Sequence, residues 1–428
     1  MGRTIDVVEG APFDLAPADA SQLRRAVERL KAQLRPKFGM LVEEGGRFRL
    51  SNIVGTIDLS PGTVLQVAPK IPNGGDWGAA VVSLLTGEER IEAGGERPAG
   101  ASKVHTRLVD AVADAYAARL ERAYRQDGPI LSMERYDLQS PSLRGKLHAS
   151  RWARSSSWRP HIFPVSRSVI SHENPYSQLL IEVTAALQTR VRSARTRLRL
   201  STVARDLSLG GVARGTGVVP LVRQLPSQWA AYKPAWSLAM AILSKTSLFG
   251  PSGHHTGLSL AVEAWPLLET LLGRTLADVA VYGRTVGRNF HHVSQGDVNL
   301  MRRVHGTAAA SFAPRPDGRL YEDGKLIASF EAKYTAFDGT MSESNHIYQA
   351  IATASACRAP LAVLVYPEQC ATQSWALNLP PGSPTHLLAI GLNLFKWPAL
   401  PPRERGAAML DALATLGNSK PLPGVAVA

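Results

Sequence analysis

The stretch Arg315-Pro-Asp-Gly-Arg-Leu-Tyr-Glu-Asp-Gly-Lys-Leu-Ile-Ala-Ser-Phe-Glu-Ala-Lys-Tyr334 decides the fold of the C-terminal part of the chain. Asp323-Gly324 lies in its middle, and glycine accepts the positive φ angle that a two-residue type I′ turn requires. After this turn, apolar residues alternate with polar ones as far as Tyr334, apart from Ile327, which is the pattern of a half-buried strand. The sequence therefore predicts an antiparallel hairpin, whose first strand begins at Asp317.

Three side chains of this hairpin form a candidate catalytic group. Glu331 and Lys333 are two residues apart on one strand, so both project from the same face. Folding of the hairpin can bring the carboxylate of Asp317 beside Glu331. Two carboxylates supply the hard oxygen ligands that Mg²⁺ accepts, and a lysine can stabilise the charge that develops on a phosphate. We therefore expect Asp317 and Glu331 to bind Mg²⁺ and Lys333 to act beside them in phosphodiester hydrolysis.

The elements around the hairpin are consistent with this interpretation. Helical spacing predicts a helix over residues 345–356, and the apolar run 361–366 predicts a strand after it. Before the hairpin, the pattern over 258–276 predicts a longer helix, followed by a strand over 279–282. The order of these elements is typical of an α/β domain.

Two further side chains are candidates for the same site. Glu263, in the helix predicted before the hairpin, is expected to act as a third catalytic carboxylate and metal ligand, and Glu269 is its rival for that role. Gln349, in the helix predicted after the hairpin, is expected to contact water at the metal or the phosphate. A surface role for Glu263 and Gln349 is the alternative.

Composition limits the function classes that remain open. The chain has 428 residues, of which 48 are Lys or Arg and 35 are Asp or Glu, so its formal charge is +13. This charge favours a polyanionic partner such as DNA. Only two cysteines are present, and no apolar run approaches the roughly 18–20 residues that span a bilayer. The N-terminal sequence has no secretion signal, so we expect a cytoplasmic protein with no membrane contact.

Three domains are expected within a mixed α/β fold. Residues 1–98 predict a β-rich domain with one amphipathic helix, 99–235 a helical, Arg-rich middle segment, and 236–428 the α/β domain. The glycine-rich stretch 90–102 marks the first boundary. In the first domain a helix is predicted over 20–34, and strands are predicted over 47–50, 53–59 and 64–69.

Basic residues concentrate in the middle segment and are interleaved with Trp152 and Trp158. Cations follow phosphates and aromatic rings stack on bases, so this segment is a candidate DNA-binding surface. The alternative is that both tryptophans anchor a core and the cations are solvated. The cations assigned to DNA binding are Arg144, Lys146, Arg151, Arg154 and Arg159.

The hairpin residues match the PD-(D/E)xK nuclease pattern, written here as Pro316-Asp317 and Glu331-Ala-Lys333, and the chain resembles the McrC family of nuclease subunits. Glu263 with Trp265 is similar to the "YE-W" helix of related nucleases in the same superfamily, with Val262 in place of the tyrosine. Further similarities to the McrC family occur along most of the chain. They include Asn52-Ile-Val-Gly-Thr-Ile-Asp-Leu59, Leu65-Gln-Val-Ala-Pro-Lys-Ile71, Leu143-Arg-Gly-Lys-Leu147, Asn174-Pro-Tyr-Ser-Gln-Leu-Leu180, Tyr348-Gln349 and Val365-Tyr366-Pro367. The family's motif strand commonly reads Asp-x-Lys, so Glu331 is a departure that should retain metal binding.

The resemblance implies a C-terminal restriction-endonuclease-like domain and a Mg²⁺-dependent cut in double-stranded DNA. It also implies docking through the N-terminal region onto a ring of McrB-like AAA+ GTPase subunits, in a restriction or phage-defence complex. The sequence contains no Gly-x-x-x-x-Gly-Lys-Ser/Thr phosphate loop, so the chain is not expected to be the motor. Two alternatives remain: a non-catalytic DNA-binding adaptor that activates a partner NTPase, and a stand-alone repair nuclease.

Overall fold

The computed structural model describes residues 3–60, 63–71, 77–86, 108–208, 224–245, 259–298, 301–302, 311–312, 315–337, 343–368 and 370–415. It confirms the mixed α/β class and divides the chain into two compact units. Unit 1 comprises Met1–Ala111 and Ser259–Ala428, and unit 2 comprises Val112–Leu258. Within the described ranges, no helix is both long and apolar enough to span a membrane.

The division differs from the three expected domains. The boundary expected after residue 98 lies outside the described residues, as does the stretch 90–102. The boundary expected after residue 235 falls inside helix α7 (Lys233–Lys245), and the structure instead divides the chain between Leu258 and Ser259. The physical reason is that the first residues after unit 2, Ser259–Glu263, form a strand of the N-terminal sheet. The N-terminal and C-terminal parts of the chain therefore belong to one unit.

Two sheets and helix α1 (Pro17–Leu34) form the N-terminal part of unit 1. Helix α1 confirms the amphipathic helix, because its buried face of Leu23, Val27 and Leu30 packs into the same core as Ile57 and Leu65. The strands predicted in this region are also confirmed. In sheet order, the N-terminal sheet is β1 (Arg3–Val8), β6 (Thr63–Ala68), β5 (Ile53–Ser60) and β10 (Ser259–Glu263), and the small sheet is β2 (Pro12–Phe13), β4 (Arg47–Leu50) and β3 (Leu41–Glu44).

Strand β10 corrects the helix predicted over residues 258–276. Ser259–Glu263 pairs antiparallel with β5, and the helix, α8 (Trp265–Thr285), begins only after it. Gly55 on β5 has φ +125°, and a Cβ there would lie 2.3 Å from the carbonyl oxygen of Leu260, so only glycine permits this close approach. Residues 259–263 form a strand because they pair with the edge of an existing sheet, and no local sequence pattern predicts that pairing.

Helix α8 also corrects the strand predicted over 279–282. Leu268, Leu272, Val279 and Gly283 are buried along one face of the helix, which therefore continues through the short apolar run. A run of four apolar residues is ambiguous between a strand and a buried helix turn. The helix is favoured here because α8 packs closely against α10 (Pro402–Ala414). The approach is so close that a Cβ on Gly406 of α10 would meet the backbone of Asp278 on α8.

The C-terminal sheet contains the predicted hairpin. Glu322 pairs with Lys325, and Asp323 and Gly324 between them have φ 48° and 78°, which confirms the type I′ turn. The strand after the hairpin runs parallel to the second hairpin strand, and the next strand in space is parallel as well, whereas the last strand at this edge is antiparallel. In sheet order the strands are β11 (Phe290–Val293), β14 (Gly318–Glu322), β15 (Lys325–Ala332), β16 (Leu361–Tyr366), β18 (His386–Gly391) and β17 (Gln373–Ala376).

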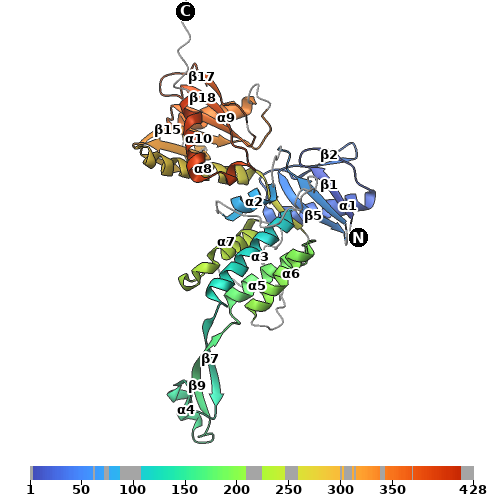
Figure 1. Ribbon diagram of the computed structural model, residues 1–428, viewed down its shortest axis with the longest axis vertical. Coiled ribbons are helices and arrows are strands. Elements are labelled where there is room, and N and C mark those ends of the chain that lie inside the picture. The colour runs from blue at the N-terminus through green and yellow to red at the C-terminus, as the bar shows by residue number, and fades with distance from the viewer. Residues whose placement is uncertain are drawn as a thin grey trace, which may run out of the picture. The chain divides into compact units, whose positions relative to one another are not determined.

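Helices cover both faces of the C-terminal sheet (Figure 1). Helix α9 (Ser344–Cys357), which confirms the helix predicted over 345–356, packs Ala350 and Ala354 against Leu364. Helix α8 lies on the other face, where a Cβ on Gly318 would lie 2.5 Å from Cδ1 of Leu276. The glycine of the Pro-Asp-Gly sequence therefore lets α8 approach the hairpin. The smaller elements of unit 1 are α2 (Trp77–Thr86), β12 (Met301–Arg302), β13 (Ser311–Phe312) and η2 (Trp397–Ala399).

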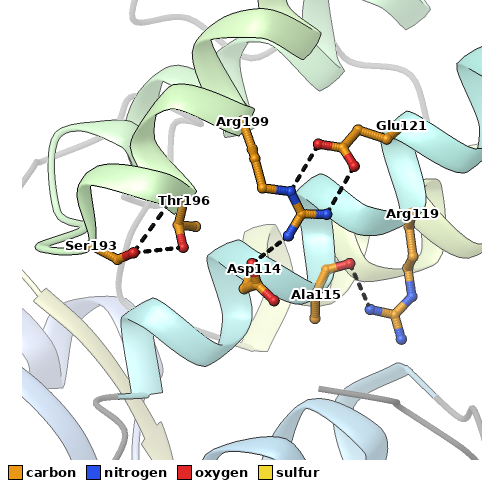
Figure 2. A network of polar contacts seen from close by, with 7 residues as sticks. All are labelled: Asp114, Ala115, Arg119, Glu121, Ser193, Thr196 and Arg199. Carbon is orange, nitrogen blue, oxygen red and sulfur yellow. Dashed lines mark hydrogen bonds and ion pairs between the residues drawn. The ribbon is translucent and has the colours of Figure 1, made fainter. Parts of the chain in front are cut away.

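Unit 2 is a group of helices from one end of which a ribbon of two long strands extends, with a short third strand paired to one of them (Figure 1). An ion-pair network holds two of the helices together: Arg199 pairs with Asp114 and Glu121, as Figure 2 shows. Arg199 therefore has a structural role between these two helices. The elements are α3 (Leu108–Asp127, most of it in unit 2), β7 (Ser132–Ser140), β8 (Lys146–Leu147), α4 (Ala149–Ser155), β9 (Phe163–Ser171), α5 (Pro175–Gln188), α6 (Ala194–Leu207), η1 (Ser227–Tyr232) and α7.

Candidate active site

The hairpin brings Asp317 and Glu331 together. Asp317 immediately precedes β14; its backbone N–H donates to the Phe330 carbonyl at 3.0 Å, and its Oδ2 accepts from the Ala332 N–H at 2.7 Å. These two bonds fix the Asp317 carboxylate beside Glu331, whose side chain is almost fully buried. Strand pairing and one side-chain hydrogen bond therefore produce the convergence that the motif predicts.

Lys333 and Gln349 complete one side of this group. The Lys333 ammonium lies 3.5 Å from Oε2 of Glu331 and donates to Oε1 of Gln349 at 2.7 Å. The Gln349 amide donates in turn to Oε2 of Glu331 at 3.0 Å. Gln349 therefore bridges the lysine and the carboxylate from helix α9, which places it in the site.

Glu269, rather than Glu263, is the carboxylate that reaches Asp317. Glu269 lies on α8, accepts from the Gln295 amide at 2.9 Å, and is close enough to Asp317 to share a proton with it. Glu263 ends strand β10 and accepts from the Trp265 indole at 3.3 Å. The expected position of Glu263 on the helix is therefore wrong, and of the two rivals Glu269 is the one that contacts Asp317.

Burial and crowding raise the pKa values of these carboxyl groups. Burial raises the pKa of Glu331 to about 7, and the neighbouring Asp317 charge contributes to the rise. Burial and the same Asp317 charge raise the pKa of Glu269 to about 7. Burial also raises the pKa of Asp317, against the opposing effect of the Ala332 hydrogen bond. Three carboxyl groups in a poorly solvated space favour either bound protons or a cation.

The donor set fits a magnesium ion. Oε1 of Glu331 is buried and completes no hydrogen bond of good geometry, although the Thr353 hydroxyl is near enough to favour the charged carboxylate. In the described part of the chain, no three His, Cys, Asp or Glu side chains enclose a metal position by themselves. Mg²⁺ needs no such cage, because it usually binds one or two carboxylates and completes its shell with water and substrate phosphate.

Lys37 is a candidate site residue that sequence reasoning missed. It follows helix α1, and its ammonium lies 4.5 Å from the centre of the Trp265 ring, where Phe38 makes an edge-on contact. Its charge lowers the pKa values of Glu263, Glu269 and Asp317. No sequence spacing connects Lys37 with the hairpin, so only the packing of α8 against the N-terminal part of unit 1 reveals it.

The five cations assigned to DNA binding all lie in unit 2, on the ribbon formed by β7, β9 and their connecting segment, and all five are exposed. Trp152 is partly buried against Phe163, with ring centres 6.0 Å apart, whereas Trp158 is 65% exposed and lies under Arg159. Neither tryptophan is therefore fully buried: Trp152 packs on one neighbouring ring, and Trp158 faces solvent. The five are Arg144, Lys146, Arg151, Arg154 and Arg159.

Comparison with protein families decides the relationship of this chain. Residues 48–367, three-quarters of the sequence, match the family described as McrBC 5-methylcytosine restriction system component. The chain belongs to the McrBC family. The McrBC match includes both Gly55 and the hairpin from Asp317 to Lys333, so it spans the two parts of unit 1 that β10 joins.

A chain in one solved assembly of McrB with bound McrC shares the fold of this chain. One chain of the refined half-complex from a tetradecameric assembly of Thermococcus gammatolerans McrB AAA+ hexamers with bound McrC is 14% identical and has a TM-score of 0.64. The alignment covers 96% of this chain and 100% of that chain. The cryo-EM structure of the T. gammatolerans McrBC complex gives 16% identity and a TM-score of 0.46 over 64% of this chain and 88% of that chain. A comparison with curated proteins found no match.

Proposed function

We propose that this McrBC-family chain is the McrC-like nuclease subunit, a Mg²⁺-dependent DNA endonuclease with a PD-(D/E)xK site. One observation carries the proposal: Asp317, Glu331 and Lys333 converge at one end of the hairpin, and Oε1 of Glu331 is buried without completing a hydrogen bond. The Thr353 hydroxyl is nearby but does not complete a hydrogen bond of good geometry, and a buried carboxylate oxygen in this state is costly unless a cation binds it.

Each residue then has a defined part in hydrolysis. Asp317 and Glu331 would hold Mg²⁺, which supplies charge compensation at the phosphate and lowers the pKa of water. Lys333 donates to a phosphate oxygen and offsets the negative charge that develops there. Gln349 holds the ammonium of Lys333 in place through its 2.7 Å contact. Glu269, with its pKa of about 7, can carry the proton that it shares with Asp317.

Isosteric substitution tests the catalytic assignment. Asp317→Asn and Lys333→Met should each abolish Mg²⁺-dependent cleavage of double-stranded DNA by the chain in complex with its GTPase partner. Asp323→Asn is the matched control, because it makes the same chemical change at the exposed hairpin turn and asparagine tolerates positive φ. Cleavage that survives Asp317→Asn while DNA binding and GTPase stimulation persist would favour the adaptor instead.

We further propose that the partner is a McrB-like AAA+ GTPase. Support comes from the shared fold with a chain from an assembly of McrB AAA+ hexamers with bound McrC. The proposal predicts that the purified chain raises the GTPase rate of such a ring, and that cutting requires the ring and GTP. Cutting by the chain with Mg²⁺ alone would favour the stand-alone repair nuclease.

The exposed ribbon of unit 2 has features of a protein-binding surface as well as a DNA-binding one. Met133 and Ile170 are paired across β7 and β9, and they are 74% and 66% exposed. Large apolar side chains that lie together on an exposed surface are typical of a protein contact. Arg151 and Arg154 on α4 add positive charge beside it.

Two pairs of substitutions distinguish these partners. If the ribbon contacts the GTPase, Met133→Ser with Ile170→Ser should abolish GTPase stimulation and leave binding of free DNA intact. If the ribbon binds DNA, Arg151→Ala with Arg154→Ala should weaken DNA binding and reduce its salt dependence, with GTPase stimulation unchanged.

A further inference from the structure

A buried carboxylate joins the N-terminal sheet to the strand that carries the candidate active site. Glu9 directly follows β1 and is only 2% exposed. Its Oε1 accepts from the backbone N–H of Asn52 at 2.8 Å, and its Oε2 accepts from the Tyr334 hydroxyl at 2.8 Å. A longer contact of 3.4 Å joins Oε2 to the backbone N–H of Lys70.

Tyr334 is the residue after Lys333, so this contact fixes the exit of the motif strand. The Lys70 ammonium lies 4.9 Å from the centre of the Tyr334 ring and therefore supports the same side chain from a second direction. On its other side, Lys333 donates its backbone N–H to the Val365 carbonyl at 2.8 Å. The backbone on either side of the catalytic lysine is thus tied down, once to β16 and once to Glu9.

The same carboxylate reaches helix α8 through Asn52. The Asn52 carbonyl accepts from the backbone N–H of Ala264 at 3.2 Å, and α8 begins at the next residue. Asn52 itself has φ 59°, a left-handed conformation that its two backbone contacts hold in place. A hydrogen-bonded chain therefore runs from Tyr334 through Glu9 and Asn52 to the start of the helix that carries Glu269.

We propose that Glu9, Tyr334 and Asn52 form a positioning relay that sets the placement of Lys333 relative to Glu269, so that the N-terminal sheet controls the metal affinity of the site. The three residues touch neither metal nor substrate. Only the expected effect on metal binding and cleavage rests on the proposed nuclease function. The hydrogen bonds that connect β15 with α8 are present in the metal-free protein.

The energetics favour a sensitive coupling. Burial raises the pKa of Glu9, and the Tyr334 hydroxyl and the Lys70 charge oppose this rise. Loss of the hydroxyl would leave a buried carboxylate oxygen with one long contact, which favours protonation or rearrangement of Glu9. Either change weakens or moves the hydrogen bond that Oε1 of Glu9 accepts from the Asn52 N–H. A shift of Asn52 in turn disturbs the bond between its carbonyl and the Ala264 N–H, at the start of α8.

Tyr334→Phe tests the relay directly, because it removes one hydroxyl and keeps the ring over Lys70. Tyr321→Phe is the matched control; it makes the same change on neighbouring strand β14, where the Tyr321 ring stacks on His291. Hydrogen exchange in the metal-free protein is the first measurement. We expect Tyr334→Phe to speed exchange at residues 264–270, which are distant from Tyr334 in sequence and are not bonded to its hydroxyl. We expect no such change in Tyr321→Phe.

Calorimetric binding of Mn²⁺, used in place of Mg²⁺, is the second measurement. Outer positioning contacts of this kind change metal affinity or activity by about 10–100-fold, so we expect Tyr334→Phe to weaken Mn²⁺ binding at least about tenfold. Glu9→Gln should have a similar effect, and the double variant should be no worse than the worse single one, because both break one relay.

The outcomes separate the relay from the nuclease proposal. Faster exchange confined to the neighbourhood of Tyr334, with Mn²⁺ affinity unchanged, would overturn the relay, as would additive effects in the double variant. If the exchange result holds but wild-type protein with its partner cuts no DNA, the nuclease proposal fails and the relay stands as a structural coupling.

Discussion

Replacement of Glu331 by glutamine should stabilise the metal-free protein while it abolishes cleavage. Glutamine has the same shape as glutamate and can still accept the Gln349 amide hydrogen bond. It carries no charge, so it avoids the cost of an ionised carboxylate buried beside Asp317. A substitution that removes function and raises stability is the signature of a site whose charges are held together for a ligand.

The magnitude follows from the pKa of Glu331. This pKa is about 7 in the folded protein against an ordinary value of 4.5, a difference of about 2.5 units that corresponds to about 3 kcal/mol. Between these two pH values the folded protein binds more protons than the unfolded chain. The free energy of unfolding therefore falls as pH rises from about 4.5 to about 7, and the loss persists at higher pH.

Urea unfolding in EDTA at pH 5 and pH 8 measures the effect. At pH 8, Glu331→Gln should unfold with a free energy about 3 kcal/mol higher than wild type, and at pH 5 most of this advantage should disappear. Excess Mg²⁺ should reverse the order by stabilising only the wild type.

Glu322→Gln is the matched control, because Arg288 holds the pKa of Glu322 below its ordinary value. That variant should lose a little stability at neutral pH, by up to about 1 kcal/mol. A Glu331→Gln protein that is less stable than wild type at pH 8 in EDTA would refute the reasoning.

Three other outcomes are expected. Glu269→Gln should lower the rate of DNA cleavage by at least about tenfold, because it removes the carboxyl that shares a proton with Asp317. Glu263→Gln should cut as wild type does, and single-turnover kinetics of both variants show which of the two carboxyl groups takes part. Lys37→Met should move the pH–rate profile to higher pH, because the Lys37 charge lowers the pKa values of Asp317 and Glu269; an unmoved profile would exclude this influence. Arg405→Met should lower the free energy of unfolding by about 3–5 kcal/mol, because it leaves the buried carboxylate of Asp278 without its arginine at 2.6 Å, and urea unfolding measures this loss.

The hairpin was predictable because its information is local. Asp323-Gly324 fixes the turn, and the alternation after it fixes which side chains share a face with Glu331. The two-residue turn alone would place Asp317 opposite Phe330. A one-residue shift of the pairing between Leu320 and Tyr321 brings Asp317 opposite Glu331 instead, and the sequence does not reveal that shift. Helix α9 and strand β16 were predictable for the same reason, since each has one clear periodicity over its length.

The third carboxylate was not predictable from local pattern. Glu263 and Glu269 both lie in one apolar stretch, and the choice between them depends on where the helix begins. That start is set by pairing of Ser259–Glu263 with β5, about two hundred residues earlier in the chain, and by Gly55 there, which leaves room for the Leu260 backbone. Lys37 and Glu9 enter the neighbourhood of the hairpin by the same long-range packing.

By itself, the sequence determined the mixed α/β class, the hairpin, and the residues Asp317, Glu331 and Lys333 as a group. Periodicity and turn chemistry act over a few residues, so they can be read without the rest of the chain. Only the tertiary structure decided that Glu269 joins the group, that Gln349 bridges its lysine and carboxylate, and that Glu9 ties the motif strand to the N-terminal sheet. These contacts join residues that are distant in sequence, and burial of a shared core, which no local pattern encodes, brings them together.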